Sequence, residues 1–280
     1  MSNTASQNFI TSFDALVKQA FQGSGVLRET VRVKTGVVGS THVFPKLGKG
    51  VATERIPQTD VIPMNVVHSK ATATIQDWNA PEYSDIYDLS KLSFDEKKEL
   101  ANVIASAMGR RLDQLIINAM IAGANSTTVG VNIGGSNTGL NIDKILRAKR
   151  LMDDAGVPDD GERYMVVSAY ALEQALLDPK ISSQDYNILR PLMEGSLKKY
   201  ATFNFKMIEA RTEGGLPVAS SVRSNFAYHK SAVGLAIGLD MRTAVDWIAE
   251  KTSWLMNGMF SAGSVAIDNG GIYTVSTYEA

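Results

Sequence analysis

Ser261 comes nearest to a catalytic nucleophile in this sequence. It stands in Gly258-Met-Phe-Ser261-Ala-Gly263, which approaches the nucleophile-elbow motif of hydrolases but is one residue too long for the G-x-S-x-G spacing. A serine nucleophile also needs a histidine as its base, and the sequence contains three histidines: His42, His68 and His229. The first two fall in segments that we expect to project, and the third has apolar neighbours. We interpret all three as packing or surface residues and predict no catalytic residue.

Phosphate and metal binding also lack an adequate motif. The glycine-rich loop at residues 130–139 does not fit G-x-x-x-x-G-K-[ST], and no Ser or Thr follows Lys49. The acidic pairs at 153–154 and 159–160 flank a turn but lack the alternating ligands and closing Glu of a calcium loop. The sequence has no cysteine, which excludes disulfides and thiolate sites. We predict no cofactor, no metal ion and no enzymatic activity; an α/β enzyme with its site near residues 130–139 is the least favoured alternative.

The charge balance argues against a dedicated nucleic-acid-binding protein. The 280 residues include 28 basic and 29 acidic side chains, for a net charge of −1, whereas such a protein needs an excess of Lys and Arg facing phosphate. No apolar run approaches the ~18–20 residues that cross a bilayer, and residues 1–6 lack the features of a signal peptide. We therefore expect a protein that is made in a cytoplasm and has no membrane partner.

Four basic residues fall on one predicted helix: Lys97, Lys98, Arg110 and Arg111. Their favoured interpretation is a solvated helix face paired with acidic neighbours, among them Glu99 and Asp113. The alternative is a weak, sequence-independent contact with packaged nucleic acid.

The segments that would position these residues begin with two unusual arms. Residues 6–21 carry a helical apolar stripe that suits docking on protein: Phe9, Phe13, Leu16 and Phe21. Residues 29–78 read as two extended arms of alternating apolar and polar side chains. They are joined by an irregular tip, which starts in the turn-rich stretch at residues 44–50 and continues with Pro57 and Pro63. A two-stranded hairpin has no core of its own and is marginal in water. It must therefore pack either on its parent domain or on a neighbouring subunit.

The rest of the chain predicts a long helix and a mixed α/β domain. Apolar residues at helical spacing fill residues 93–124, after a capping box formed by Ser93 and Glu96. Helices and strands then alternate over residues 140–244. The closing strands at 245–280 have no nearby partner in sequence, so we expect them to pack on the long helix. The predicted fold class is α+β.

This order of elements resembles the major capsid proteins of tailed bacteriophages, which have the Hong Kong 97-like fold. Three stretches resemble that family locally, and the last two are closest to capsid proteins of short-tailed phages: Phe44-Pro-Lys-Leu-Gly48, Tyr228-His-Lys-Ser-Ala-Val-Gly234 and Gly263-Ser-Val-Ala-Ile-Asp268. The resemblance implies five parts: an N-terminal arm (1–29), an E-loop (30–78), a P-domain (79–139) with its spine helix, an A-domain (140–244) and closing P-domain strands (245–280).

The resemblance also implies the function and its surfaces. Copies of the chain would form pentamers and hexamers in an icosahedral shell around a double-stranded DNA genome. A separate scaffolding protein, a portal and a decoration protein would be further partners, with assembly in the host cytoplasm. Subunit contacts would come from the four apolar arm residues named above and from an E-loop tip made of Phe44, Pro45, Lys46, Leu47 and Lys49. The alternative on the same fold is an encapsulin-like nanocompartment shell.

Overall fold

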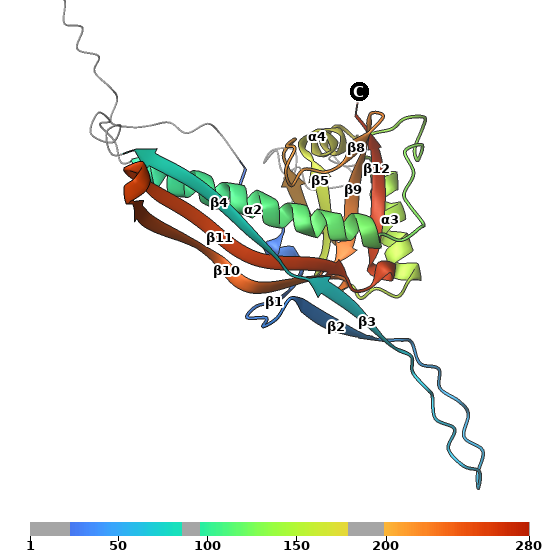
Figure 1. The fold of residues 1–280 in the computed structure, drawn as a ribbon. Helices are drawn as coiled ribbons and strands as arrows, with labels where there is room; N and C mark the ends of the chain where they lie inside the picture. The colour runs from blue at the N-terminus through green and yellow to red at the C-terminus, as the bar shows by residue number, and fades with distance from the viewer. Residues whose placement is uncertain (1–22, 86–95, 179–198, 280) are drawn as a thin grey trace, which may run out of the picture.

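Two sheets, one long helix and a projecting hairpin make up the computed structural model, which describes residues 23–85, 96–178 and 199–279 (Figure 1). The first sheet has four strands in the order β1 (Arg32–Lys34), β10 (Val233–Ile248), β11 (Ser253–Ala266) and β4 (Gln76–Asp85). The β1–β10 pairing is parallel and the other two pairings are antiparallel.

The long helix α2 (Glu96–Gly123) lies along this sheet (Figure 1). Its buried apolar side chains recur every fourth residue, the spacing of one helix face: Ile104, Met108, Leu112 and Ile116. They share a core with Met256 and Phe260 of β11. The helix predicted at residues 93–124 is confirmed from Glu96 onward, and its capping residue Ser93 lies outside the described residues. No helix of the described residues is both long enough and apolar enough to span a membrane.

The second sheet, together with two helices, forms what we call the rounded half of the molecule. Five strands follow the order β12 (Ile272–Tyr278), β9 (Val222–His229), β5 (Arg163–Ser168), β7 (Phe203–Ile208) and β6 (Lys199–Tyr200), and β8 (Val218–Ala219) pairs with β9. The helices α3 (Ile142–Asp154) and α4 (Ala169–Leu177) pack on it around a separate core that includes Met152, Met165 and Phe203. Short 3-10 helices mark the turns: η1 (Arg28–Thr30), η2 (Lys230–Ala232), η3 (Ala249–Lys251) and η4 (Asn269–Gly271).

The projecting hairpin pairs β2 (Thr41–Leu47) with β3 (His68–Thr74). Its ordered part is shorter than the arms predicted at residues 29–78, because β1 pairs with β10 and β4 pairs with β11. Residues 48–67 form the irregular tip, which includes Pro57 and Pro63 as predicted but begins after Leu47 and not at Phe44. The strand reaches further because Pro45 is tolerated in a two-stranded ribbon, where it pairs with Lys70.

Two predicted boundaries in the second half of the chain do not follow the sheets. A division at residue 244 cuts through β10, whose whole length from Val233 lies in the four-stranded sheet. The closing segment also divides: β11 packs on α2, as predicted for residues 245–280, but β12 pairs with β9 in the other sheet. Local alternation of residue types does not specify the partner of a strand, and this explains both errors.

Candidate assembly interface

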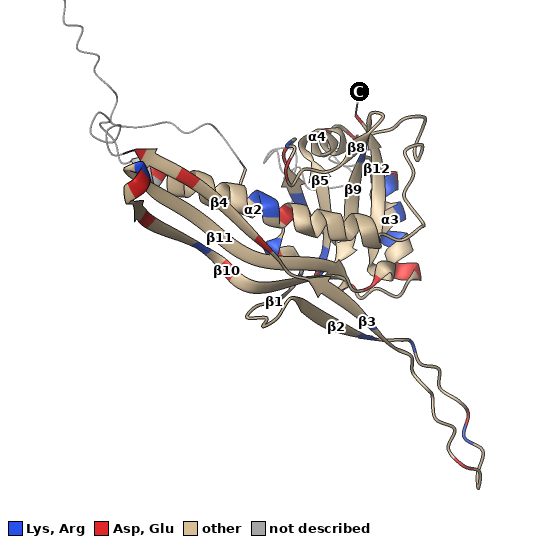
Figure 2. Cartoon of the chain, viewed as in Figure 1, with Lys and Arg blue, Asp and Glu red and all other residues tan. Residues whose placement is uncertain are grey.

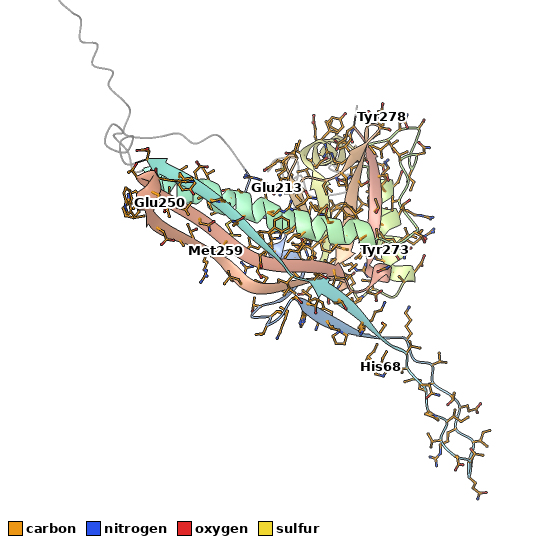
Figure 3. The ribbon with its side chains drawn as sticks, viewed as in Figure 1. His68, Glu213, Glu250, Met259, Tyr273 and Tyr278 are labelled. Atoms are coloured by element: carbon orange, nitrogen blue, oxygen red, sulfur yellow. The ribbon has the colours of Figure 1, made fainter. Side chains whose placement is uncertain are left out.

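The hairpin tip at residues 48–67 exposes apolar side chains along an uncovered ribbon. Six large ones are between 55% and 85% exposed: Val51, Ile56, Val61, Ile62, Met64 and Val67. Figure 3 shows side chains of this tip extending outward beyond His68. Figure 2 shows basic and acidic positions of both signs along the same ribbon, which are Lys49, Glu54, Arg55 and Asp60. A backbone hydrogen bond from Gly48 N–H to the Val67 carbonyl, at 2.8 Å, closes the ribbon at its base. Exposed apolar surface of this extent is typical of a protein interface.

The base of the hairpin, by contrast, is packed against the chain's own sheet. Phe44 is only 2% exposed and forms a small core with Ala73 and Ala236. A side chain at Gly234 would have its Cβ 2.8 Å from the Phe44 ring, so β10 needs a glycine there. The prediction that Phe44 belongs to an exposed tip is therefore wrong. The alternation of β2 turns this ring toward β10, while Pro45 and Leu47 remain exposed.

Two lysines predicted at the tip hold the base of the hairpin to the rounded half of the molecule. Lys46 Nζ lies 2.8 Å from a carboxylate oxygen of Asp268, and Lys49 Nζ donates to the Ala155 carbonyl at 3.1 Å. The two contacts border a cavity of about 400 Å³, which His229 also lines. Both contacts lie within one chain. Lys46 belongs to β2 at the base of the hairpin, whereas Lys49 is an exposed residue at the start of the tip. The two contacts set the direction of the hairpin, and a role of either lysine in a subunit contact stays a prediction.

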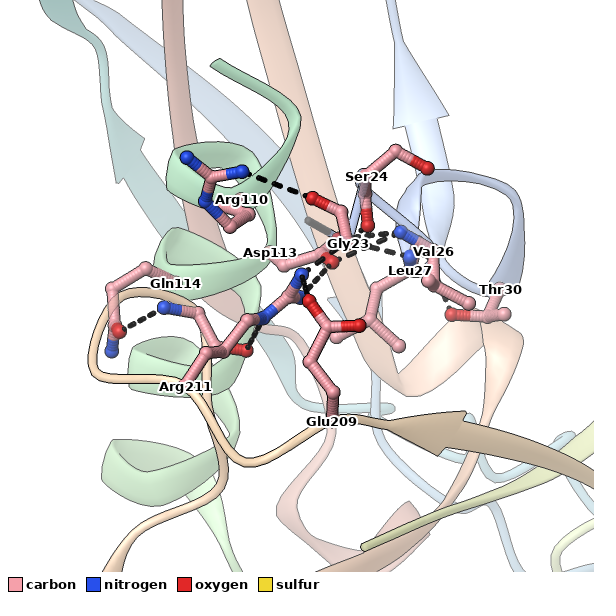
Figure 4. A network of polar contacts seen from close by, with 11 residues as sticks. Gly23, Ser24, Val26, Leu27, Thr30, Arg110, Asp113, Gln114, Glu209 and Arg211 are labelled. Carbon is pink, nitrogen blue, oxygen red and sulfur yellow. Dashed lines mark hydrogen bonds and ion pairs between the residues drawn. The ribbon is translucent and has the colours of Figure 1, made fainter. Parts of the chain in front are cut away.

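The N-terminal arm joins the fold at a buried carboxylate. Its predicted contact residues, Phe9, Phe13, Leu16 and Phe21, lie outside the described residues. From residue 23 onward the chain runs against α2, where the Asp113 carboxylate accepts hydrogen bonds from the backbone N–H groups of Val26 and Leu27, each at 2.9 Å (Figure 4). We call the convergence of residues 23–27, 109–114 and 209–215 the Asp113 junction.

A second chain segment reaches the same carboxylate through Arg211. Its Nη2 lies 2.7 Å from Asp113 Oδ2, and the two side chains are 8% and 0% exposed. Burial raises the pKa of Asp113 above its usual value, and the Leu27 and Val26 amides and Arg211 oppose that rise. The residues are 98 positions apart, so the sequence offered no signal for this pair, and we had expected Asp113 to pair with basic residues on its own helix.

Of the four basic residues predicted on the long helix, the structure describes the side chains of Arg110 and Arg111. The side chains of Lys97 and Lys98 lie outside the described set. Arg110 donates to the Gly23 carbonyl at 3.0 Å. The Arg111 guanidinium lies 3.7 Å from the centre of the Trp78 ring and 3.7 Å from a carboxylate oxygen of Glu213. Both arginines thus make contacts within the chain, and DNA contact by these four residues stays a prediction.

Ser261 lies in mid-strand and not on a turn. It belongs to β11 and pairs with Leu239 on one side and Asp77 on the other. Its flanking glycines serve packing: a Cβ at Gly258 would lie 2.3 Å from Ile104, and one at Gly263 would lie 2.0 Å from the Thr74 carbonyl. The motif therefore marks close approach of neighbouring elements and presents no nucleophile.

His229 gathers with Asp160 and Glu162, whose ligand atoms lie within 4.8 Å of one another. The Ser231 backbone N–H donates to His229 Nδ1 at 3.2 Å, so the ring proton sits on Nε2 and donates to Asp160 at 3.0 Å. The backbone N–H of Glu162, followed by His229, holds the pKa of Asp160 below its usual value. Glu162 itself pairs with Lys230. Each ligand atom has a hydrogen-bond or ion-pair partner, and the histidine tautomer is the wrong one for a cation at Nε2.

The described residues thus combine a long exposed hairpin, a helix lying on an open sheet and a rounded α/β half. The sequence matches the phage capsid protein family over residues 5–279. The chain belongs to that family. A capsid protein is a structural component of the virion, and this is the role of the present chain. None of the curated proteins matches the sequence.

Solved structures of phage heads share the fold. The head structure of Helicobacter pylori bacteriophage KHP40 superposes with a TM-score of 0.79 at 12% identity, covering 99% of this chain and 98% of the other. The capsid of cyanophage P-SCSP1u gives 0.75 at 16% identity, covering 98% and 94%. Mycobacterium phage Che8 gives 0.73 at 15% identity, covering 96% and 97%. The predicted α+β capsid fold is confirmed.

Proposed function

We propose that this capsid protein assembles with copies of itself, as pentamers and hexamers, into a closed icosahedral shell that encloses a double-stranded DNA genome. The observation that carries the proposal is the tip at residues 48–67, an apolar ribbon without a core whose base is fixed to its own subunit. Such a ribbon gains stability when it lies on a neighbouring subunit. Pro45 and Leu47, at the exposed edge of the base, and the apolar arm residues 9–21 would extend this contact.

The remaining partners follow from the family. We propose a separate scaffolding protein and a portal during assembly in the host cytoplasm, and a decoration protein on the finished shell. Contact with DNA would be weak and independent of sequence, because the net charge of −1 leaves no general excess of cations. No enzymatic activity is proposed. The encapsulin-like alternative differs in its contents, which would be a cargo protein and no genome.

Electron microscopy of the purified protein, alone and co-expressed with a scaffolding candidate, tests assembly. We expect closed particles from the parent chain. Replacement of residues 51–64 by Gly-Ser-Gly should leave soluble, folded subunits that do not close, because Gly48 and Val67 still pair at the base. The matched control is Val38→Ser, a change at a valine that is 97% exposed but outside the tip. A parent that stays monomeric with and without scaffold would refute the proposal.

A further inference from the structure

Three backbones meet at the Asp113 junction with no side chain between them. A Cβ at Gly109 of α2 would lie 2.6 Å from the Gly25 nitrogen, and one at Gly25 would lie 2.8 Å from the Gly109 carbonyl oxygen. Gly214 adopts a φ of +71°, and its Cβ would lie 2.4 Å from the Arg110 carbonyl oxygen. Distances below 3.0 Å are ones that real Cβ atoms essentially never show. Residues 23–27 and 209–215 are thus both seated directly on the same turns of the helix.

Polar side chains tie each of these two segments to the helix and to each other (Figure 4). The carboxylate of Asp113 accepts from residues 26 and 27 on one side and from Arg211 on the other. Arg211 also donates to the Ser24 carbonyl at 3.3 Å, which links the two segments directly. The Gly214 N–H donates to Gln114 Oε1 at 2.7 Å and holds the second segment on α2.

The seating of one segment depends on the seating of the other because the shared charges are buried. Departure of residues 23–27 would remove two donors from Asp113 and one acceptor from Arg211. A buried ion pair that loses its supporting hydrogen bonds becomes unfavourable, so the two charged groups would have to reach water. Arg211 would then leave α2 and loosen residues 209–215. This loop runs from the end of β7 at Ile208 to β8 at Val218, within the six-stranded sheet.

We propose that the Asp113 junction is a coupling device, in which residues 23–27 and the loop at 209–215 are seated on α2 together or released together. The inference rests on the proposed function in one respect: residues 1–22 would contact a neighbouring subunit. A neighbour that draws on the arm then changes the seating of residues 23–27, and the change reaches the six-stranded sheet through Arg211. Binding of the arm by a neighbouring subunit would thereby change the position of the six-stranded sheet within the same subunit.

Hydrogen exchange of the unassembled full chain tests the coupling, with Gly109→Ala as the informative variant. The added methyl would meet Gly25 and Ser24 and none of the residues 209–215 among its nearest atoms. We expect exchange to accelerate by about tenfold at the Val26 and Leu27 amides and, equally, at the Gly214 amide, the loss of roughly one hydrogen bond's protection at each. Acceleration confined to Val26 and Leu27, with Gly214 protected as in the parent, would overturn the proposal.

Two further variants keep the test decisive. Gly130→Ala is the matched control, because a Cβ there meets nothing within 4 Å, and it should leave both regions unchanged. Asp113→Asn keeps the shape of the side chain but removes its charge, and should accelerate exchange in both segments even if Gly109→Ala does not fold. Amides of β5 report that each variant is folded. The measurement needs no shell, so a parent that never assembles would refute the proposed function while the coupling is still measured.

Discussion

The hairpin tip and the Asp113 junction place side chains in opposite environments. At residues 48–67 large apolar groups face water, whereas at the junction a carboxylate and a guanidinium are removed from it. The tip has unmet apolar surface and few internal bonds; the junction has each charge matched by several partners. The comparison teaches that one subunit can separate the two tasks of a shell protein. In the proposed shell the tip would be covered by a neighbour, whereas the junction holds the subunit's own segments together.

The largest effect is expected from breaking the junction. Arg211→Met leaves the fully buried Asp113 without its cation, so the free energy of unfolding should fall by about 3–5 kcal/mol. Chemical denaturation of the unassembled protein measures the loss. The double variant Asp113→Asn with Arg211→Met should recover part of it, because the only carboxylate that then loses its arginine is Glu209, which is 44% exposed. A single variant within about 1 kcal/mol of the parent would show that the pair is not desolvated as described.

The next effect contrasts the base of the hairpin with its tip. Phe44→Ala removes a ring that is 2% exposed, and should lower the free energy of unfolding by about 3 kcal/mol. Val61→Ser, at a side chain that is 85% exposed, should change it by less than about 0.5 kcal/mol. The same two proteins, viewed by electron microscopy, sharpen the contrast: Val61→Ser should reduce closed particles although its subunit is as stable as the parent. Equal stability losses in both variants would contradict the division between base and tip.

A smaller and pH-dependent effect concerns a second buried charge, for which the described part of the chain supplies no carboxylate partner. Lys144 is fully buried and its Nζ donates only to the carbonyls of Thr138 and Ser276 among the described contacts. Burial lowers its pKa from 10.5 to about 8. Between these two pH values the unfolded chain binds the proton and the folded chain releases it, so stability should rise with pH across this window.

Denaturation of the parent and of Lys144→Met at several pH values from 7 to about 10.5 isolates this contribution, since other titrating groups cancel in the difference. The parent should gain stability relative to the variant as the pH rises. A constant difference would mean that Lys144 keeps its proton in the folded state. The two sites can then be compared: the Asp113 carboxylate is paired with an arginine, whereas the Lys144 ammonium group donates to carbonyl groups. The pH dependence measures how much stability the buried ammonium group costs.

Local patterns predicted the elements better than their partners. The apolar spacing of residues 93–124 was enough to predict the long helix, and the predicted alternation of helices and strands is present in α3, β5, α4 and β7. Pro45 suggested a turn because it cannot donate to a ladder, yet a two-stranded ribbon tolerates it. The hairpin was therefore placed too early along the chain.

Contacts between residues far apart in the chain could not be predicted from the sequence. β12 joins β9 and not the long helix, and Asp113 meets Arg211 across 98 positions. Periodicity reports which face of an element is buried, but it says nothing about what covers that face. The need for a supporting surface was inferred because a two-stranded hairpin has no core of its own. The buried polar junction was missed because charged residues on a helix are usually solvated.

The packing of Phe44 on β10 has a consequence for folding during synthesis. The N-terminal part of a chain leaves the ribosome first, so the hairpin emerges early. Gly234 and Ala236 of β10, on which the Phe44 ring packs, emerge much later. Until then the hairpin has no fixed direction, and an unfinished polypeptide presents no correctly aimed tip. We therefore expect that a growing chain cannot present a correctly aimed tip to a neighbour until synthesis has passed β10.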